Sequence, residues 1–144
     1  MIGKIRQAKK EDFAFIFDSW SKSSKKSTLN AKMSKKLFNE RLENLILELL
    51  KNGARITLMV DPDDEDFIFA WVCTGTLGNL PVVYYAFSKL TFRQHGFCKT
   101  LLAANSIDGI NTYIYCNRTS IIDVLDKKSS TLKAGTYDPY VQFL

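Results

Sequence analysis

Two stretches in the first third of the chain repeat apolar residues at helical spacing. The first places them at i, i+3, i+4 and i+7, which predicts a helix with one buried face formed by Phe13, Ile16, Phe17 and Trp20. The second predicts a helix from about Lys35 to Asn52, which Gly53 ends. A short strand is predicted from Ile2 to Ala8, and the polar segment Ser21 to Ser34 has no period and predicts a connection between the helices.

The middle of the chain alternates strand-like runs with turn signals. ARITLMV (54–60) and FIFAWVCTG (67–75) flank DPDDED, whose proline and acidic residues suit a hairpin loop. The run VVYYAFSKL (82–90) is almost continuously apolar, as expected of a central strand buried on both faces.

The last third continues the alternation of helices and strands. A helix is predicted from about His95 to Ala104, followed by the strand NTYIYC (111–116). A short helix and a terminal strand segment, TYDPYVQFL, complete the chain; the short helix carries Ile121, Ile122 and Leu125. The predicted order is β-α-α-β-β-β-α-β-α-β, which indicates an α/β (α+β) protein with a mixed sheet and helices around it.

Composition narrows the class of protein. With 144 residues, 46% of them hydrophobic, the chain suits one domain, 1–144. No apolar run approaches the ~18 residues of a membrane span, and the start lacks a signal-peptide core, so we expect a cytoplasmic protein. Three cysteines without a CxxC pair, together with a single histidine, predict reduced thiols and no metal site: Cys73, Cys98 and Cys116.

The net charge of +5 is concentrated early in the chain. Such a cluster can attract a polyanion, but no aromatic or arginine residues are interleaved with it, which favours a solvated loop and helix start over a nucleic-acid interface. The cluster consists of Lys22, Lys25, Lys26, Lys32, Lys35 and Lys36.

The stretch TFRQHGFCKT lies between the apolar run and the third predicted helix. A helix start has backbone N–H groups without internal partners and a partial positive charge, so phosphate groups bind there. Gly96 lets a ligand approach the backbone, and Arg93 can add a charge-assisted hydrogen bond. Because RxxG also occurs by chance, a plain turn with a surface arginine is the alternative.

Together with the element order, this stretch resembles the Q/RxxGxG/A loop of the GCN5-related N-acetyltransferase (GNAT) family. The matching residues are Arg93, Gln94, His95, Gly96, Phe97 and Cys98. The resemblance implies a mostly antiparallel sheet, a loop that holds the pyrophosphate of acetyl-CoA, and a splayed strand end, matched by Phe87 and Ser88, along the pantetheine arm. It also implies a cofactor contact at Asn117, which can equally cap a following helix.

The sequence departs from the family pattern at two points. Cys98 stands where the family prefers glycine or alanine, and Val124 stands seven residues after Asn117, where the family has a tyrosine acid. No general base can be assigned either, since Glu11 and Asp18 are best explained as exposed positions. The catalytic residues therefore stay unassigned, and the substitute acids to consider are Tyr113, Tyr115, Tyr137 and Tyr140.

These observations predict an acyl-CoA-dependent N-acyltransferase that carries acetyl from acetyl-CoA to a primary amine of a protein or small molecule. The alternative is a protein that keeps the fold without turnover and binds a partner protein. The opening IRQAKKEDFAFIFDSW resembles small acetyltransferase-like proteins of bacteria and bacteriophages, so a phage component acting in the host cytoplasm is one form of this alternative. The acceptor and the oligomeric state have no sequence signal.

Overall fold

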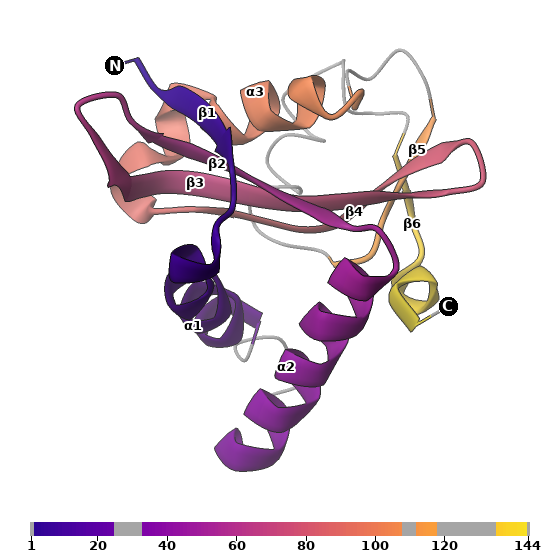
Figure 1. Cartoon of the computed structure of the whole chain (residues 1–144). Helices are drawn as coiled ribbons and strands as arrows, with labels where there is room; N and C mark the ends of the chain where they lie inside the picture. Colours follow the sequence, from indigo (N-terminus) through magenta and orange to yellow (C-terminus); the bar gives the residue numbers. More distant parts are fainter. Residues whose placement is uncertain (1, 25–32, 108–111, 118–134, 144) are drawn as a thin grey trace.

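Six strands form a single sheet in the order β1-β2-β3-β4-β5-β6 (Figure 1). The structure is a computed structural model that describes residues 2–24, 33–107, 112–117 and 135–143. Neighbouring strands are antiparallel from β1 to β4, whereas β4, β5 and β6 are parallel, so the predicted mixed, mostly antiparallel sheet is confirmed. The strands are β1 (Lys4–Gln7), β2 (Arg55–Asp61), β3 (Asp64–Leu77), β4 (Leu80–Ser88), β5 (Tyr113–Tyr115) and β6 (Gly135–Tyr137).

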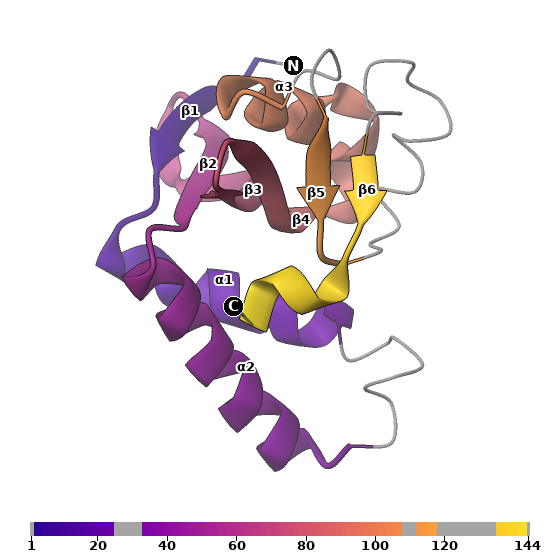
Figure 2. The same ribbon diagram turned by 90° about the vertical axis from the view of Figure 1, so that its right-hand side faces the viewer.

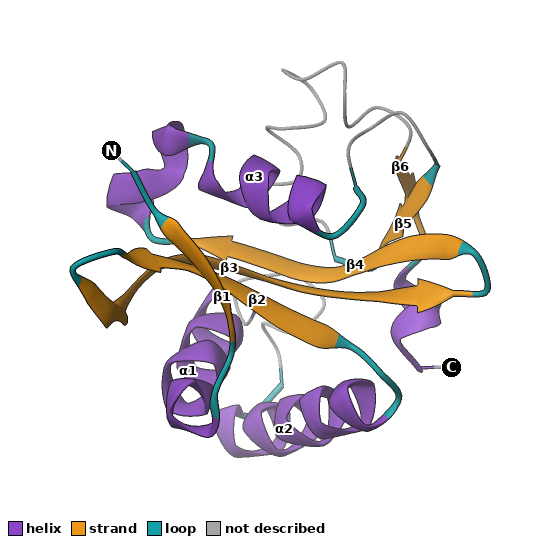
Figure 3. Cartoon of the chain, turned by 45° about the horizontal axis from the view of Figure 1, so that its top comes forward, coloured by secondary structure: helices purple, strands orange, loops and turns teal. Residues whose placement is uncertain are grey.

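Helices cover both faces of the sheet. In Figure 3, α1 (Phe13–Ser24) and α2 (Lys35–Lys51) lie against one face and α3 (Phe97–Ala104) against the other. Short 3-10 helices lead into α1, lead into α3 and end the described chain; they are η1 (Lys10–Asp12), η2 (Leu90–His95) and η4 (Pro139–Phe143). The predicted helix around Ile121 lies outside the described residues.

The first helix extends further than its apolar stripe predicts. Ile16 and Trp20 are buried, as expected, but α1 continues through Ser21 to Ser24, so the prediction that a connection begins at Ser21 was wrong. The hydroxyls of Ser23 and Ser24 donate to backbone carbonyls four residues earlier, which satisfies these polar side chains within the helix.

The second helix has the predicted boundaries. Ser34 caps its start by accepting a hydrogen bond from the backbone N–H of Leu37. Its end comes at Asn52, before Gly53 at φ 98°. Within the described ranges, no helix is long and apolar enough to cross a membrane.

β4 is an internal strand, as its apolar run predicts. It lies between β3 and β5, and its buried side chains face both helical layers. The strand ends at Ser88, two residues before the predicted end. The loop between β2 and β3 is also shorter than predicted, because Asp61 and Asp64 belong to the strands themselves. The side chain of each accepts a hydrogen bond from the backbone N–H two residues further along the chain.

Two cores hold the layers together. Toward α1 and α2, the Trp20 ring stacks on Tyr85 at 4.9 Å between centroids and contacts Trp71 at 5.4 Å. Toward α3, the Phe97 ring stacks on Phe69 at 5.2 Å. Aromatic contacts of this kind add to the free energy gained from burying apolar area, so the sheet is fixed on both sides.

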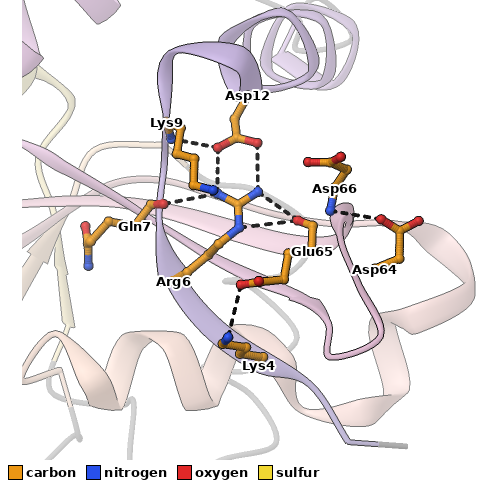
Figure 4. A network of polar contacts seen from close by, with 8 residues as sticks. All are labelled: Lys4, Arg6, Gln7, Lys9, Asp12, Asp64, Glu65 and Asp66. Carbon is orange, nitrogen blue, oxygen red and sulfur yellow. Dashed lines mark hydrogen bonds and ion pairs between the residues drawn. The ribbon is translucent and has the colours of Figure 1, made fainter.

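A buried ion pair fixes the N-terminal strand. The Arg6 guanidinium donates to both carboxylate oxygens of Asp12, at 2.7 and 2.9 Å, and to the backbone carbonyl of Glu65 (Figure 4). Asp12 also accepts from the backbone N–H of Lys9 at 2.6 Å. The hydrogen bonds from Arg6 hold the pKa of the Asp12 carboxyl below its ordinary value. The contact joins β1, the start of α1 and the β2–β3 hairpin.

Candidate functional site

β4 and β5 pair over only the first part of β4. The paired residues are Val82 with Ile114 and Val83 with Tyr115, and the backbone N–H of Cys116 then donates to the carbonyl of Val83 at 3.0 Å. β5 ends there, whereas β4 continues for five more residues to Ser88. Among the described residues, this leaves the second half of β4 without a strand partner on its β5 side.

The direction of the backbone groups in that half follows from the register with β3. The backbone N–H of Lys89 donates to the carbonyl of Phe69 in β3. Hydrogen-bonded pairs alternate along an antiparallel ladder, so the backbone N–H and C=O of Phe87 and Tyr85 also point toward β3. Ala86 therefore turns its backbone N–H and C=O toward the side that β5 has left. Tyr84 has no partner residue in β3, and this bulge decides which residues of β4 point their backbone groups toward β3 and which point them toward β5.

Asn117 braces the point where the strands part. Its side-chain amide donates to the backbone carbonyl of Tyr84 at 2.6 Å and to the side-chain oxygen of Gln142 at 3.3 Å. The amide thus takes the place of the next backbone donor of β5 and satisfies a carbonyl that would otherwise be unpaired. Whether Asn117 also caps a helix concerns residues outside the described ranges.

Gly96 separates the 3-10 helix η2 from α3. Its φ of 71° and ψ of 20° are left-handed, so no right-handed helix can run through it, and α3 begins at Phe97 where the sequence predicted His95. Apart from its chain neighbours, a Cβ atom at Gly96 would meet no atom of the described residues within 4 Å, so the space beside its Cα is open. The first N–H groups of α3 have no partners within the helix.

The loop is electropositive. The segment 81–107 contains three cationic side chains and no carboxylate. Arg93 and Lys99 are exposed, and the Nε of Arg93 donates to the backbone carbonyl of Ser88 at 3.3 Å. The third cation, Lys89, lies over the rings of Phe15 and Phe67 instead. A helix start flanked by two exposed cations suits an anionic ligand.

The other predicted site residues, in the loop and at the end of β4, differ in whether their side chains are exposed or buried. His95 is exposed, with its ring 5.6 Å from that of Phe97, while the side chains of Phe97 and Cys98 are buried beneath α3. Only the backbone of these last two can meet a ligand. Phe87 packs its ring against Trp71 on the α1 face, Ser88 is buried, and the side chain of Gln94 lies outside the described part.

Cys98 has the environment of a structural thiol. Burial raises its pKa to about 12, and its Sγ donates to the backbone carbonyl of Phe87 at 3.5 Å. A thiol in this state is protonated near neutral pH, so it is no nucleophile. Its size is accommodated next to the helix start, which makes the departure from glycine or alanine structurally mild.

The structure supplies no obvious acid or base among the residues that it describes. Glu11 is exposed, and Asp18 forms an exposed ion pair with Lys22 at 3.0 Å. Val124 lies outside the described residues. Of the four late tyrosines, Tyr113 and Tyr115 are buried, whereas Tyr137 and Tyr140 are 40% and 76% exposed. In the described part of the chain, no three His, Cys, Asp or Glu side chains are grouped to hold a metal ion.

Two residues at the site are missing from the predicted set. Tyr84 supplies the bulge and the braced carbonyl, and Ala86 supplies the outward-facing backbone groups. Both belong to a continuous apolar run, in which nothing marks a backbone role. The only available signal was the position of the run directly before the RxxG loop.

Similar solved structures share this arrangement of elements. An acetyltransferase of the GNAT family from Staphylococcus aureus Mu50 matches with a TM-score of 0.52 and 18% identity, over 72% of this chain and 62% of that one. A candidate acetyl transferase from Pyrococcus furiosus matches with a TM-score of 0.63 and 14% identity, over 89% and 92% of the two chains. This chain has the GNAT fold. The aligned region covers less than two thirds of the Staphylococcus protein. In the Pyrococcus protein it covers nearly the whole chain.

A third match covers nearly the full length of both chains. A candidate acetyltransferase from Clostridium difficile 630 has a TM-score of 0.56 and 12% identity, over 96% of this chain and 92% of that one. No protein-family model matches the sequence, and no curated protein matches it. The likeness therefore lies in the fold, and function has to be argued from the residues of the site.

Proposed function

We propose that this protein is an acyl-CoA-dependent N-acyltransferase that transfers the acetyl group of acetyl-CoA to a primary amine. The observation that carries the proposal is the parting of β4 from β5 after Val83, next to the left-handed Gly96 at the start of α3. A strand edge without a strand partner among the described residues lies beside a positive helix start there, since Cys98 of α3 contacts the carbonyl of Phe87. Such a pair suits an extended ligand with amides at one end and phosphates at the other.

The residues of the site fit the two parts of acetyl-CoA. The N–H and C=O of Ala86, which have no strand partner among the described residues, would pair with the amides of the pantetheine arm, beside Phe87, Ser88 and Asn117. The pyrophosphate would lie against the backbone at Gly96 and the first N–H groups of α3. Exposed Arg93 would add charge-assisted hydrogen bonds to phosphate oxygens, with His95 and Gln94 beside it.

Acyl transfer at this site needs no covalent enzyme intermediate. The amine nitrogen, after losing a proton, attacks the thioester carbonyl carbon; a C–N bond forms, the C–S bond breaks, and coenzyme A departs as a thiolate that takes up a proton. The protein's part is to hold the two reactants in line and to polarise the carbonyl with a backbone donor at the parted β4 edge. Since Cys98 is protonated and buried, direct attack is the simpler route.

Turnover is expected to be slow. The family's tyrosine acid is replaced by Val124, and the four late tyrosines are either buried or widely exposed. A thiolate is a fairly stable leaving group, so losing a general acid costs a factor of ~10² to 10⁴ in rate without abolishing the reaction.

The same replacement supports a second candidate, a GNAT-fold protein that binds acetyl-CoA or a partner protein without turnover. The two candidates separate in one experiment. Purified protein is mixed with acetyl-CoA and a panel of amines, and released thiol is followed with a chromogenic disulfide. Amine-dependent thiol release supports the acyltransferase; acetyl-CoA binding without release from any amine supports the non-catalytic candidate.

A further inference from the structure

The helix α2 and the C-terminal 3-10 helix η4, whose ribbons are drawn in Figure 2, contact one another. A groove of about 390 Å³ lies between them. Buried apolar residues of both elements form part of its wall. Its polar and aromatic lining includes Arg41, Asn44, Glu48, Tyr84, Gln142 and Phe143.

One wall of the groove is a stripe along α2. Arg41, Asn44 and Glu48 follow one another at i, i+3 and i+7, so all three lie on one side of the helix. Arg41 and Glu48 are two turns apart, about 10 Å along the axis. Both are exposed, and neither side chain has an ion-pair or hydrogen-bond partner among the residues that the structure describes. The groove thus presents a cation and an anion at separate positions, each without a partner in the described part of the chain.

The groove adjoins the candidate acyl-transfer site. Tyr84 and Gln142 line it, and these are the two residues to which Asn117 donates its side-chain hydrogen bonds. The end of α2 joins β2, with the backbone N–H of Ala54 donating to the carbonyl of Leu49. Glu48 therefore lies nearer the sheet than Arg41, so the anion is on the side of the reacting centre.

We infer that the acceptor is a small zwitterion held in this groove, with its primary amine toward Glu48 and Tyr84 and a carboxylate, several bonds away, paired with Arg41. This inference rests on the proposed function. Glu48 attracts the ammonium form of the amine, which gives its proton to water before attack. A plain alkylamine leaves Arg41 without a partner, and a second ammonium group near Arg41 is repelled, so an amine with a distant carboxylate fits best.

The groove is tested with 6-aminohexanoate as the probe, whose amine and carboxylate are separated by five methylenes. Ligand-observed NMR measures its affinity for the wild type, Arg41→Gln and Glu48→Gln, with hexylamine as the comparison ligand. We expect each substitution to weaken 6-aminohexanoate about tenfold, as for loss of a charge-assisted hydrogen bond. Glu48→Gln should also weaken the binding of hexylamine, whereas Arg41→Gln should leave the affinity for hexylamine unchanged.

Matched controls come from the same helix. Glu40 and Lys36 are exposed on α2 and do not line the groove. Glu40→Gln and Lys36→Gln should therefore leave the affinity unchanged, and far-ultraviolet circular dichroism confirms that all four variants keep their helices. Equal affinities in all variants, or no binding by the wild type, would overturn the inference.

The binding assay needs no acetyl-CoA, so its outcome is separate from that of the proposed function. Acetyl-CoA binding with thiol release from other amines, combined with no 6-aminohexanoate binding, would reject the zwitterionic acceptor alone. Binding in the groove without any acetyl-CoA binding would reject the acyltransferase and with it the role of the zwitterion as acceptor.

Discussion

The side-chain amide of Asn117 lies 2.6 Å from the backbone carbonyl oxygen of Tyr84, at the point where β4 and β5 part. This contact lets the strands separate without leaving the Tyr84 carbonyl unpaired, and it sets the edge along which Ala86 faces outward. The hydrogen bond from the same amide to Gln142 ties this edge to the C-terminal 3-10 helix and to the groove beside α2.

Replacing Asn117 with alanine should therefore loosen the parted strands. The half-buried carbonyl of Tyr84 loses its donor, which should lower the free energy of unfolding by about 1 to 2 kcal/mol. Acetyl-CoA affinity should fall as well, because the edge is no longer held in position. Urea unfolding and titration calorimetry measure the two effects. Thr112→Ala is the control and should change neither quantity, because Thr112 is exposed and directly precedes β5 at the opposite end of that strand.

Gly96→Asp tests the helix start directly. Aspartate in left-handed backbone costs about 1 kcal/mol relative to glycine, and it places a negative charge where phosphates would lie. Gly78→Asp is a matched control, since Gly78 has a φ of 60° and also faces open space but lies in the β3–β4 turn. Both variants should lose similar stability, whereas only Gly96→Asp should weaken acetyl-CoA binding, by about tenfold or more. Equal acetyl-CoA affinity in the two variants would contradict the phosphate cradle.

The ion pair between Arg6 and Asp12 should dominate the acid sensitivity of the N-terminal strand. Their side chains are 9% and 7% exposed, so Asp12→Asn leaves a nearly buried guanidinium without its counter-charge and should cost about 3 kcal/mol of unfolding free energy. Asp18→Asn removes an exposed pair and should cost less than about 0.5 kcal/mol. Urea titrations at pH 7 compare the two variants.

The same pair sets the direction of the pH dependence. The folded-state pKa of Asp12 lies below the ordinary value of 3.8, so its contribution is present above that value and is lost as pH falls through the lowered one. The wild type should thus lose stability below about pH 4 more steeply than Asp12→Asn. Parallel stability curves for the two proteins over that range would show that the pair does not hold β1.

Cys98→Ala should leave acyl transfer within about threefold of the wild type, because a thiol with a pKa of about 12 is not a nucleophile at neutral pH. Loss of a true covalent nucleophile lowers turnover by several orders of magnitude. Iodoacetamide should leave Cys98 unmodified in the folded protein and alkylate it after unfolding, as followed by mass spectrometry. Rapid alkylation under native conditions would contradict the buried environment.

Local patterns predicted most of the fold. The stripe containing Ile16 and Trp20 and the continuous run of β4 report burial directly, so the helices and the central strand could be placed. The extension of α1 to Ser24 could not, because the polar residues of its last turn have no apolar period. The hydrogen bonds between Arg6 and Asp12 link a strand to a 3-10 turn and likewise leave no periodic signal.

The candidate site was predictable only in part. Gly96 and Arg93 belong to one contiguous motif, so they can be recognised from the sequence alone. The braced carbonyl of Tyr84 depends on a bulge and on Asn117, 33 residues later, so only the folded sheet brings them together. The groove between Arg41 on α2 and Gln142 on η4 likewise joins segments about a hundred residues apart.

The central claim is that the parted β4 edge and the start of α3 together hold acetyl-CoA. Titration calorimetry of acetyl-CoA into the purified protein tests it most directly, with the isolated 3′-phospho-ADP moiety and pantetheine titrated separately. We expect saturable binding of one acetyl-CoA per chain, tighter than that of either fragment because both halves of the site are used. Absence of saturable acetyl-CoA binding, or an affinity no greater than that of one fragment, would contradict it.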